Sequence, residues 1–117
     1  TLLPGFVTKA GAPWMAFGLM GGSMQPQGHT QLLMNILVFE MDVQDAIDAA
    51  RFRHLEGLRV ALESPVGPDV RAQLAALGHE IADEASVNFG GAQAIIRLDQ
   101  GWAAGSDPRK DGMAVGR

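Results

Sequence analysis

A pair of adjacent glycines is the feature of this sequence best suited to chemistry. Gly21 and Gly22 lie in "GLMGGSMQPQGH" (residues 18–29), between an apolar strand-like run and an apolar helix-like run. Glycine at such a junction marks either a tight turn or a backbone that must approach another group closely. Two successive N–H groups near the positive end of a helix dipole can also face a developing oxyanion. From the residues alone the tight turn is favoured, and the oxyanion interpretation stays open.

Other residues with chemical potential are scattered along the chain. Thr1 could act as an N-terminal nucleophile whose own α-amino group is the base, although any cleavage ahead of a threonine leaves the same residue first. The sequence has no cysteine, and its histidines lack partners at metal-ligand spacing, which favours ordinary core or surface histidines over a metal site. They are His29, His54 and His79. The glycine-rich stretch also lacks the dinucleotide and P-loop spacings.

Two expected elements position the glycine pair. Residues 5–18 are predicted to form a hairpin, because apolar residues flank the Gly- and Pro-containing turn "KAGAP" on both sides. Residues 29–41 place apolar side chains at steps of three and four, which predicts a helix buried along one side. The glycine pair would then join a strand to a helix.

The remaining chain is predicted to alternate helices and strands. Asp42 is a candidate N-cap, with Asp45 in the first turn, for a helix over 43–52, and this capping accounts for an acidic edge without catalysis. Further expected elements are a strand over 58–64, a helix from Pro68 to Gly78 with Leu74 and Leu77 inward, and a hairpin turning at 99–101. Together these elements predict one domain, residues 1–117, of the α+β or layered α/β class.

Composition narrows the classes of partner. The 117 residues suffice for one core, and a net charge of -4 offers no electrostatic footprint for a phosphate backbone, so nucleic acid is not expected as a partner. The longest apolar run, "LLMNILVF", is far shorter than the roughly 20 residues that a bilayer span needs. A first residue other than Met suggests a processed or truncated chain. The compartment stays open among periplasm, cytoplasm and secretion.

Three ordered stretches together resemble one enzyme family. They are "PGFVTKAGAPWMAFGLMGGSMQPQGHTQLLMNILVFEMDVQDAIDAARFRH", "GGAQAI" and "GSDPRKDGMAVG", and they cover nearly the whole chain. Their combination is similar to the C-terminal part of the γ-glutamyltransferase family. The resemblance implies an N-terminal nucleophile hydrolase that cuts itself into two subunits and has an αββα-sandwich fold of the α+β class. It implies no cofactor and no metal.

The resemblance also implies roles for particular residues. Gly21 and Gly22 match the glycine pair whose backbone amides form the family's oxyanion hole. The attacking threonine lies upstream of this chain, so Thr1 instead falls near a pair of hydroxyl residues that helps to bind the α-carboxylate of the substrate. Arg51 and Arg109 are expected to be structural anchors that pair with carboxylates or cap carbonyls near the site, with two solvated arginines as the alternative.

The implied reaction is acyl transfer from a γ-glutamyl compound to water or an acceptor amine. The partners would be these molecules and the remainder of the same precursor, namely its large subunit and the N-terminal part of its small subunit. Two departures leave the acyl donor open, because "GGSMQPQGH" differs from the "PGGSRI"-like stretch of glutathione-cleaving members and Ala50 stands where many relatives have proline. The alternatives are a β-lactam side-chain acylase and an inert folding or interaction fragment. The chain alone is expected to be inactive.

Overall fold

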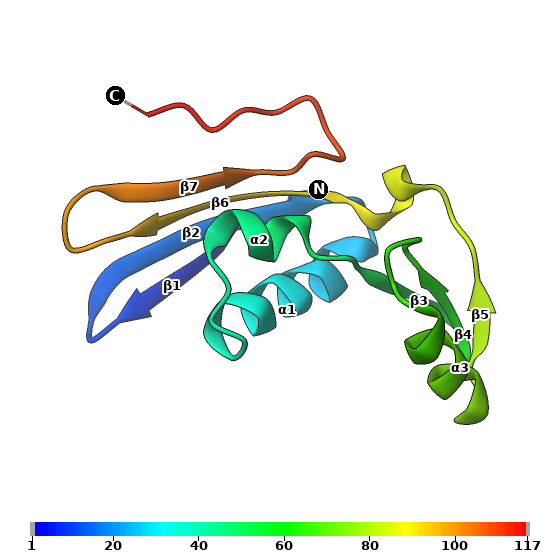
Figure 1. Cartoon of the computed structure of the whole chain (residues 1–117). Coiled ribbons are helices and arrows are strands. Elements are labelled where there is room, and N and C mark those ends of the chain that lie inside the picture. Colours follow the sequence, from blue (N-terminus) through cyan, green and yellow to red (C-terminus); the bar gives the residue numbers. More distant parts are fainter. Residues whose placement is uncertain (1, 117) are drawn as a thin grey trace.

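A four-stranded antiparallel sheet forms the larger part of the computed structural model, which describes residues 2–116 (Figure 1). Its strand order is β1-β2-β6-β7. The strands are β1 (Gly5–Lys9), β2 (Ala12–Met20), β6 (Gly91–Arg97) and β7 (Trp102–Ser106). Helices α1 (Met24–Leu37) and α2 (Val43–Asp48) both lie against one face of this sheet. None of the helices in the described part of the chain has the length and apolarity of a membrane span.

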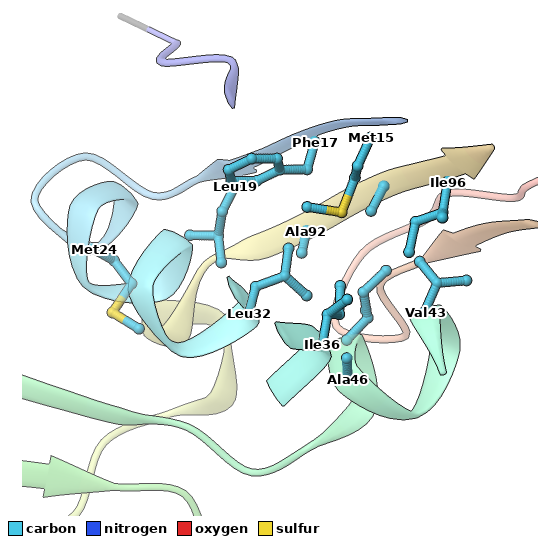
Figure 2. Close-up of a cluster of buried hydrophobic side chains, with 12 residues drawn as sticks. Met15, Phe17, Leu19, Met24, Leu32, Ile36, Val43, Ala46, Ala92 and Ile96 are labelled. Atoms are coloured by element: carbon cyan, nitrogen blue, oxygen red, sulfur yellow. The ribbon is translucent and has the colours of Figure 1, made fainter. Parts of the chain in front are cut away.

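The core lies between this sheet and its two helices (Figure 2). Successive side chains of a strand point to opposite faces, and in β2 the inward set is Met15, Phe17 and Leu19. Leu32 and Ile36, one turn apart on α1, pack onto these side chains. The helix spacing and the strand alternation therefore meet in one apolar layer.

A smaller sheet follows α2 along the chain. It consists of β3 (Phe52–Glu56), β4 (Arg59–Leu62) and β5 (Glu80–Ala82) in that order, with β4 and β5 parallel. Helix α3 (Pro68–Ala76) connects β4 to β5, and a short 3-10 turn, η1 (Ser86–Phe89), leads back to β6.

Side-chain amides of α1 attach the smaller sheet to the larger one. Gln31 accepts from the amide of Phe52 at 3.0 Å and donates to its carbonyl at 2.9 Å. Gln27, one turn earlier, makes the same two contacts with His54, at 2.7 and 3.2 Å. Two glutamines thus pair with the outer side of β3 as a neighbouring strand would.

Several predicted elements are confirmed. Both hairpins form, and the second turns at 99–101 with Gly101 at φ +89°. The N-cap is also present, since Asp42 Oδ1 accepts from the amide of Asp45 at 2.9 Å. Helix α3 begins at the predicted Pro68.

The boundaries of α1 were predicted wrongly. The helix begins at Met24 rather than at residue 29, so Gly28 lies inside it. Residue 28 is a glycine because a Cβ there would collide with the side chain of Leu19. Gly28 therefore serves close packing rather than a turn. The helix ends at Leu37, and Glu40 shortly afterwards adopts a left-handed φ of +55° that no helix can continue.

In the smaller sheet, the strand predicted over 58–64 is confirmed as β4, but the other two strands were missed. The helix predicted over 43–52 ends at Asp48, and β3 begins at Phe52 instead. Strand β5 is only three residues long and had no signal of its own. Leu77 was expected to face inward but is 76% exposed, because α3 buries none of its residues.

Candidate functional site

The glycine pair lies at the joint between β2 and α1, within a turn over residues 21–23 that we call the glycine turn (Figure 1). Gly21 has a φ of +133° and Gly22 a φ of +59°, both in the region that favours glycine. The carbonyl of Gly21 accepts from the amide of Met24, and that of Gly22 from the amide of Gln25, each at 3.1 Å. Both carbonyls thereby accept hydrogen bonds from the first turn of α1.

The amides of the glycine turn point the other way. Because a trans peptide holds its N–H opposite its C=O, the amides of Gly22 and Ser23 face away from the carbonyls that α1 uses. Neither these amides nor that of Gly21 has a hydrogen-bond acceptor among residues 2–116. Ser23 occupies the N-cap position, but its side chain caps nothing. The turn therefore presents unpaired donors at the positive end of the α1 dipole, which suits an anion or an oxyanion.

The two glycines differ in their surroundings. A Cβ on Gly21 would lie 3.0 Å from the Cα of Gly90 and 3.3 Å from the Cβ of Met24. By contrast, nothing in the described chain lies within 4 Å of a Cβ built on Gly22. Gly21 is thus fixed by neighbouring backbone, whereas Gly22 borders open space that a ligand can enter.

Four charged residues form a buried cluster where β6 begins and β7 ends. Arg51 Nη2 donates to Asp107 Oδ2 at 2.7 Å, and Arg109 Nη1 donates to Asp107 Oδ1 at 3.2 Å. Arg109 also donates through Nε and Nη2 to the two oxygens of Glu63, both at 2.6 Å. No side chain of the cluster is more than 9% exposed. The structure therefore brings Arg51 and Arg109 together through shared carboxylates.

This charged cluster also holds backbone next to the glycine turn. Asp107 Oδ2 accepts from the amide of Ala92 at 2.7 Å, and Arg51 Nη1 donates to the carbonyl of Phe89 at 3.0 Å. These two bonds fix the chain on either side of Gly90, which has a φ of +78° and packs against the turn. A Cβ on Gly90 would collide with the backbone of β2. The cluster thus braces the strand beside the glycine pair.

Burial and pairing set the charge states in the cluster. Burial lowers the pKa of the Arg51 guanidinium despite the nearby Asp107, but an arginine starts from so high a value that it stays charged. Burial alone would raise the pKa of Asp107, yet the amides of Ala92 and Arg109 and the Arg51 guanidinium outweigh it and hold that pKa below its ordinary value. Likewise, burial opposes but Glu63 outweighs it in raising the pKa of Arg109.

Sequence reasoning found only the arginines of this cluster. Asp107 stands two residues before Arg109 in "SDPRKDG", a spacing that could have suggested a local pair. Glu63, directly after β4, carried no signal, and Gly90 stood out only as the first residue of "GGAQAI", with no role assigned to it. Their roles follow from the tertiary structure.

His29, on α1, packs against β2 and hydrogen-bonds to its backbone. Its Nε2 accepts from the amide of Leu19 at 3.1 Å, and its ring meets that of Phe17 edge-on, with centroids 5.0 Å apart. Burial lowers the pKa of His29, so the ring is neutral when it accepts this bond.

We expect His29 to make the fold less stable in acid. Its folded pKa lies below the unfolded value of about 6.5, so the stability that it contributes is lost as the pH falls through that value. His29→Gln keeps an acceptor for the Leu19 amide but does not titrate. The fall in melting temperature between about pH 8 and about pH 5 should therefore be smaller in the variant. Scanning fluorimetry of the full-length protein measures it, and equal falls would contradict the assignment.

The remaining sequence candidates lie away from the glycine turn or outside the described residues. His54 Nε2 lies 3.0 Å from the carbonyl of Gly57, and His79 Nδ1 lies 3.2 Å from that of Leu58. Across residues 2–116, no three His, Cys, Asp or Glu side chains gather closely enough to hold a metal ion. Thr1 lies outside the described residues, so its role at the substrate stays a prediction.

Comparison with known proteins gives consistent matches. The profile of the Gamma-glutamyltranspeptidase family matches residues 1–117. The Glutathione hydrolase-like YwrD proenzyme of Bacillus subtilis (strain 168) is 35% identical over 126 residues, which cover 99% of this chain and 24% of that protein. The chain therefore spans about a quarter of the length of this curated relative.

Solved structures match over nearly the whole chain. Gamma-glutamyltranspeptidase from Pseudomonas nitroreducens, complexed with L-DON, superposes with a TM-score of 0.90 at 26% identity, covering 100% of this chain and 62% of that one. Cephalosporin acylase from Bacillus halodurans superposes with a TM-score of 0.90 at 41% identity, covering 94% of this chain and 21% of that one. These matches confirm the predicted α+β class and the likeness to N-terminal nucleophile hydrolase structures.

Proposed function

Because the chain belongs to the gamma-glutamyltranspeptidase family, we propose that it supplies the oxyanion-binding part of an enzyme that transfers a γ-glutamyl group to water or an amine. The observation that carries this proposal is the glycine turn. Its amides lack acceptors within the described chain, and its carbonyls are held by α1. Gly22 also borders open space, since nothing in the described chain lies within 4 Å of a Cβ built there.

The proposed chemistry proceeds in two acyl transfers. A threonine in the remainder of the precursor attacks the γ-glutamyl carbonyl carbon, and the carbonyl oxygen takes up the negative charge. Gly21 and Gly22 stabilise that oxygen through their backbone amides, with the amide of Ser23 beside them. The intermediate collapses to a threonine ester and releases the amine of the donor. Water or an acceptor amine then attacks the ester through a second oxyanion and regenerates the threonine.

Arg51 and Arg109 have a supporting role in this proposal. Neither guanidinium is free, because both are occupied by Asp107, Glu63 or backbone carbonyls. Their contribution is to hold β6 against the glycine turn through Gly90, so that the oxyanion donors are in place before substrate arrives. Preorganised donors cost no rearrangement during the reaction, which is what makes such a site effective.

The outer face of the larger sheet supports a place within a larger αββα sandwich. Cross-strand neighbours Phe6, Ala16, Ile95 and Ala104 form one apolar row on the face opposite α1. Phe6 is 62% exposed and Ile95 is 39% exposed. No helix of the described residues covers this row (Figure 1). A second sheet from the remainder of the precursor would bury it, as sheet-on-sheet packing requires.

A second candidate function is removal of the acyl side chain of a β-lactam. The specific support is the 41% identity to a cephalosporin acylase, against 26% to the gamma-glutamyltranspeptidase of Pseudomonas nitroreducens. The same turn serves both reactions, because each passes through an oxyanion at an acyl carbonyl. Only the acyl group and the leaving amine differ.

We expect the full-length protein to cut itself ahead of a threonine and then to release chromophore from a γ-glutamyl anilide. Intact mass before and after incubation detects the cut, and a cephalosporin with an amide side chain tests the second candidate in parallel. The 117-residue chain alone should release nothing, because it lacks the proposed nucleophile. Activity of that chain which Thr1→Ala abolishes would overturn the proposal, as would a full-length protein that neither cuts itself nor turns over.

A further inference from the structure

We propose that Gln25 is a positioning residue that couples the oxyanion donors to the segment beginning at Leu2. This inference rests on the proposed acyl transfer and adds a residue to it. Gln25 is the second residue after the glycine turn and the second residue of α1, and it is only 4% exposed. A long polar side chain is rarely buried so completely unless its amide is used.

The amide of Gln25 contacts backbone on two sides. Its Oε1 accepts from the amide of Leu3 at 2.8 Å, and its Nε2 donates to the carbonyl of Gly22 at 3.3 Å. The backbone amide of Gln25 donates to the same Gly22 carbonyl at 3.1 Å. Within the described residues, Gln25 therefore holds the Gly22 carbonyl with two donors and the Leu3 amide with one acceptor.

The contact with Gly22 decides where the following amide points. The Gly22 carbonyl and the Ser23 amide belong to one planar peptide, so fixing the first fixes the second. Gly22 has a left-handed φ and no neighbour within 4 Å of a Cβ position, so side-chain packing does not hold this peptide. Hydrogen bonds to its carbonyl supply the restraint instead.

The contact with Leu3 links the same residue to a hollow beside the turn. Leu2, Leu3, Pro4, Met20, Gln25 and Gln93 are among the residues that line this hollow of about 260 Å³. Met20 directly precedes the glycine pair, and Leu3 lies two residues after Thr1, the proposed carboxylate-binding residue. Gln25 thus contacts both the glycine turn, where the reacting carbonyl lies in the proposed reaction, and the segment that begins at Leu2.

Two variants separate the two contacts. Gln25→Glu keeps an acceptor for the Leu3 amide but places a carboxylate oxygen against the Gly22 carbonyl. We expect kcat for a γ-glutamyl anilide to fall roughly tenfold or more, with little change in KM, because only the donor side is lost. Gln25→Leu removes both contacts, so we expect the same loss in kcat together with a rise in KM.

A pH profile adds a readout that a structural role alone would not move. Burial and the facing carbonyl raise the pKa of the introduced carboxyl above its ordinary value of about 4.3. Once protonated, that carboxyl donates to Gly22 as the amide does. The ratio of kcat in Gln25→Glu to kcat in the wild type should therefore rise as the pH falls toward about 5. His29, one turn further along α1, titrates in both proteins, so its contribution cancels in the ratio.

Gln31→Leu is the matched control. Gln31 lies on the same helix and also holds backbone through both ends of its amide, but its partner across the fold is Phe52 in the smaller sheet. We expect a lower melting temperature in this variant with unchanged kcat and KM. Rates are taken per active site, titrated with a covalent glutamine analogue, in the full-length matured protein.

Wild-type kcat and KM in Gln25→Leu would overturn the inference, as would a pH-independent kcat ratio in Gln25→Glu. If Gln25→Leu does not mature, Gln25→Glu carries the test alone, since it preserves the side-chain volume and one contact. Failure of the proposed function looks different. In that case the wild type itself would neither mature nor release the anilide, whereas failure of this inference leaves an active wild type and insensitive variants.

Discussion

Gly22→Ala in the full-length matured enzyme is expected to lower kcat roughly 10²–10³-fold, with a smaller change in KM. The new Cβ meets no residue of the described chain, so its effect falls on what occupies the open space beside the turn. In the proposed reaction that is the scissile carbonyl. A side chain also strains the left-handed φ of +59° at Gly22, and relief of this strain turns the donating amides away from the oxyanion. Loss falls on kcat because the hydrogen bonds strengthen in the transition state.

Gly57→Ala is the matched control for this prediction. Gly57 has a φ of +53° and, like Gly22, nothing within 4 Å of a Cβ position, but it lies in the turn between β3 and β4. Both substitutions carry the same backbone strain, so the two melting temperatures should fall by similar amounts. Only Gly22→Ala should lose kcat per titrated active site. Normal kcat with a lowered melting temperature in both variants would reduce the glycine pair to a tight turn.

Asp107→Ala is expected to destabilise the protein by about 3–5 kcal/mol, because it leaves buried charge without a partner. Asp107 is 0% exposed, and its carboxylate accepts from Arg51, from Arg109 and from the amide of Ala92. Removing it leaves the buried Arg51 guanidinium without a carboxylate, whereas Arg109 keeps Glu63, and it frees the strand beside Gly90. We therefore expect slower self-cleavage as well as lower stability. Denaturant unfolding of an uncleavable precursor measures the change in stability on a single chain.

Asp83→Ala provides the surface comparison. Asp83 also pairs with an arginine, Arg71, at 3.2 Å, but its side chain is 93% exposed. The same chemical change should cost no more than about 1 kcal/mol there. Equal destabilisation by Asp83→Ala and Asp107→Ala would contradict the role of the buried cluster.

The stability of the wild type should also depend on pH. The folded pKa of Asp107 lies below the unfolded value of about 3.9, so the stability that Asp107 contributes is lost as the pH falls through that range.

Local chemistry made the larger sheet and its helices predictable from sequence. The Gly and Pro turns marked both hairpins, and a side-chain cap marked α2, because these signals act within a few residues. In the smaller sheet, the strand predicted over 58–64 forms as β4, whereas β3 and β5 were missed. Strand β5 pairs with β4 only after helix α3 has intervened, and β3 is completed on its outer side by amides from α1. Gly28 misled the prediction of α1, since its reason for being glycine is the side chain of Leu19 on another element.

In the candidate site, too, residues with a local sequence signal were predicted and residues that depend on distant contacts were not. The glycine pair stood out in the sequence because its residue type and its place between strand and helix are both local properties. Gln25, Asp107 and Glu63 did not stand out, because their importance comes from contacts across the fold. Arg51 and Arg109 were singled out as arginines, but the carboxylates that hold them could only be seen once β4, β6 and β7 were assembled.

The glutamines that flank β3 also limit the addition of a foreign strand to this edge of the sheet. An outer strand with free amides and carbonyls is a template onto which another polypeptide can add a strand, and from there sheets grow into aggregates. Gln27 and Gln31 occupy those groups at Phe52 and His54, so an incoming chain would have to displace four hydrogen bonds before gaining any. Phe52 is 47% exposed, so this edge also presents apolar surface to an incoming chain. By occupying the backbone groups of Phe52 and His54, Gln27 and Gln31 block strand addition at this edge of the smaller sheet.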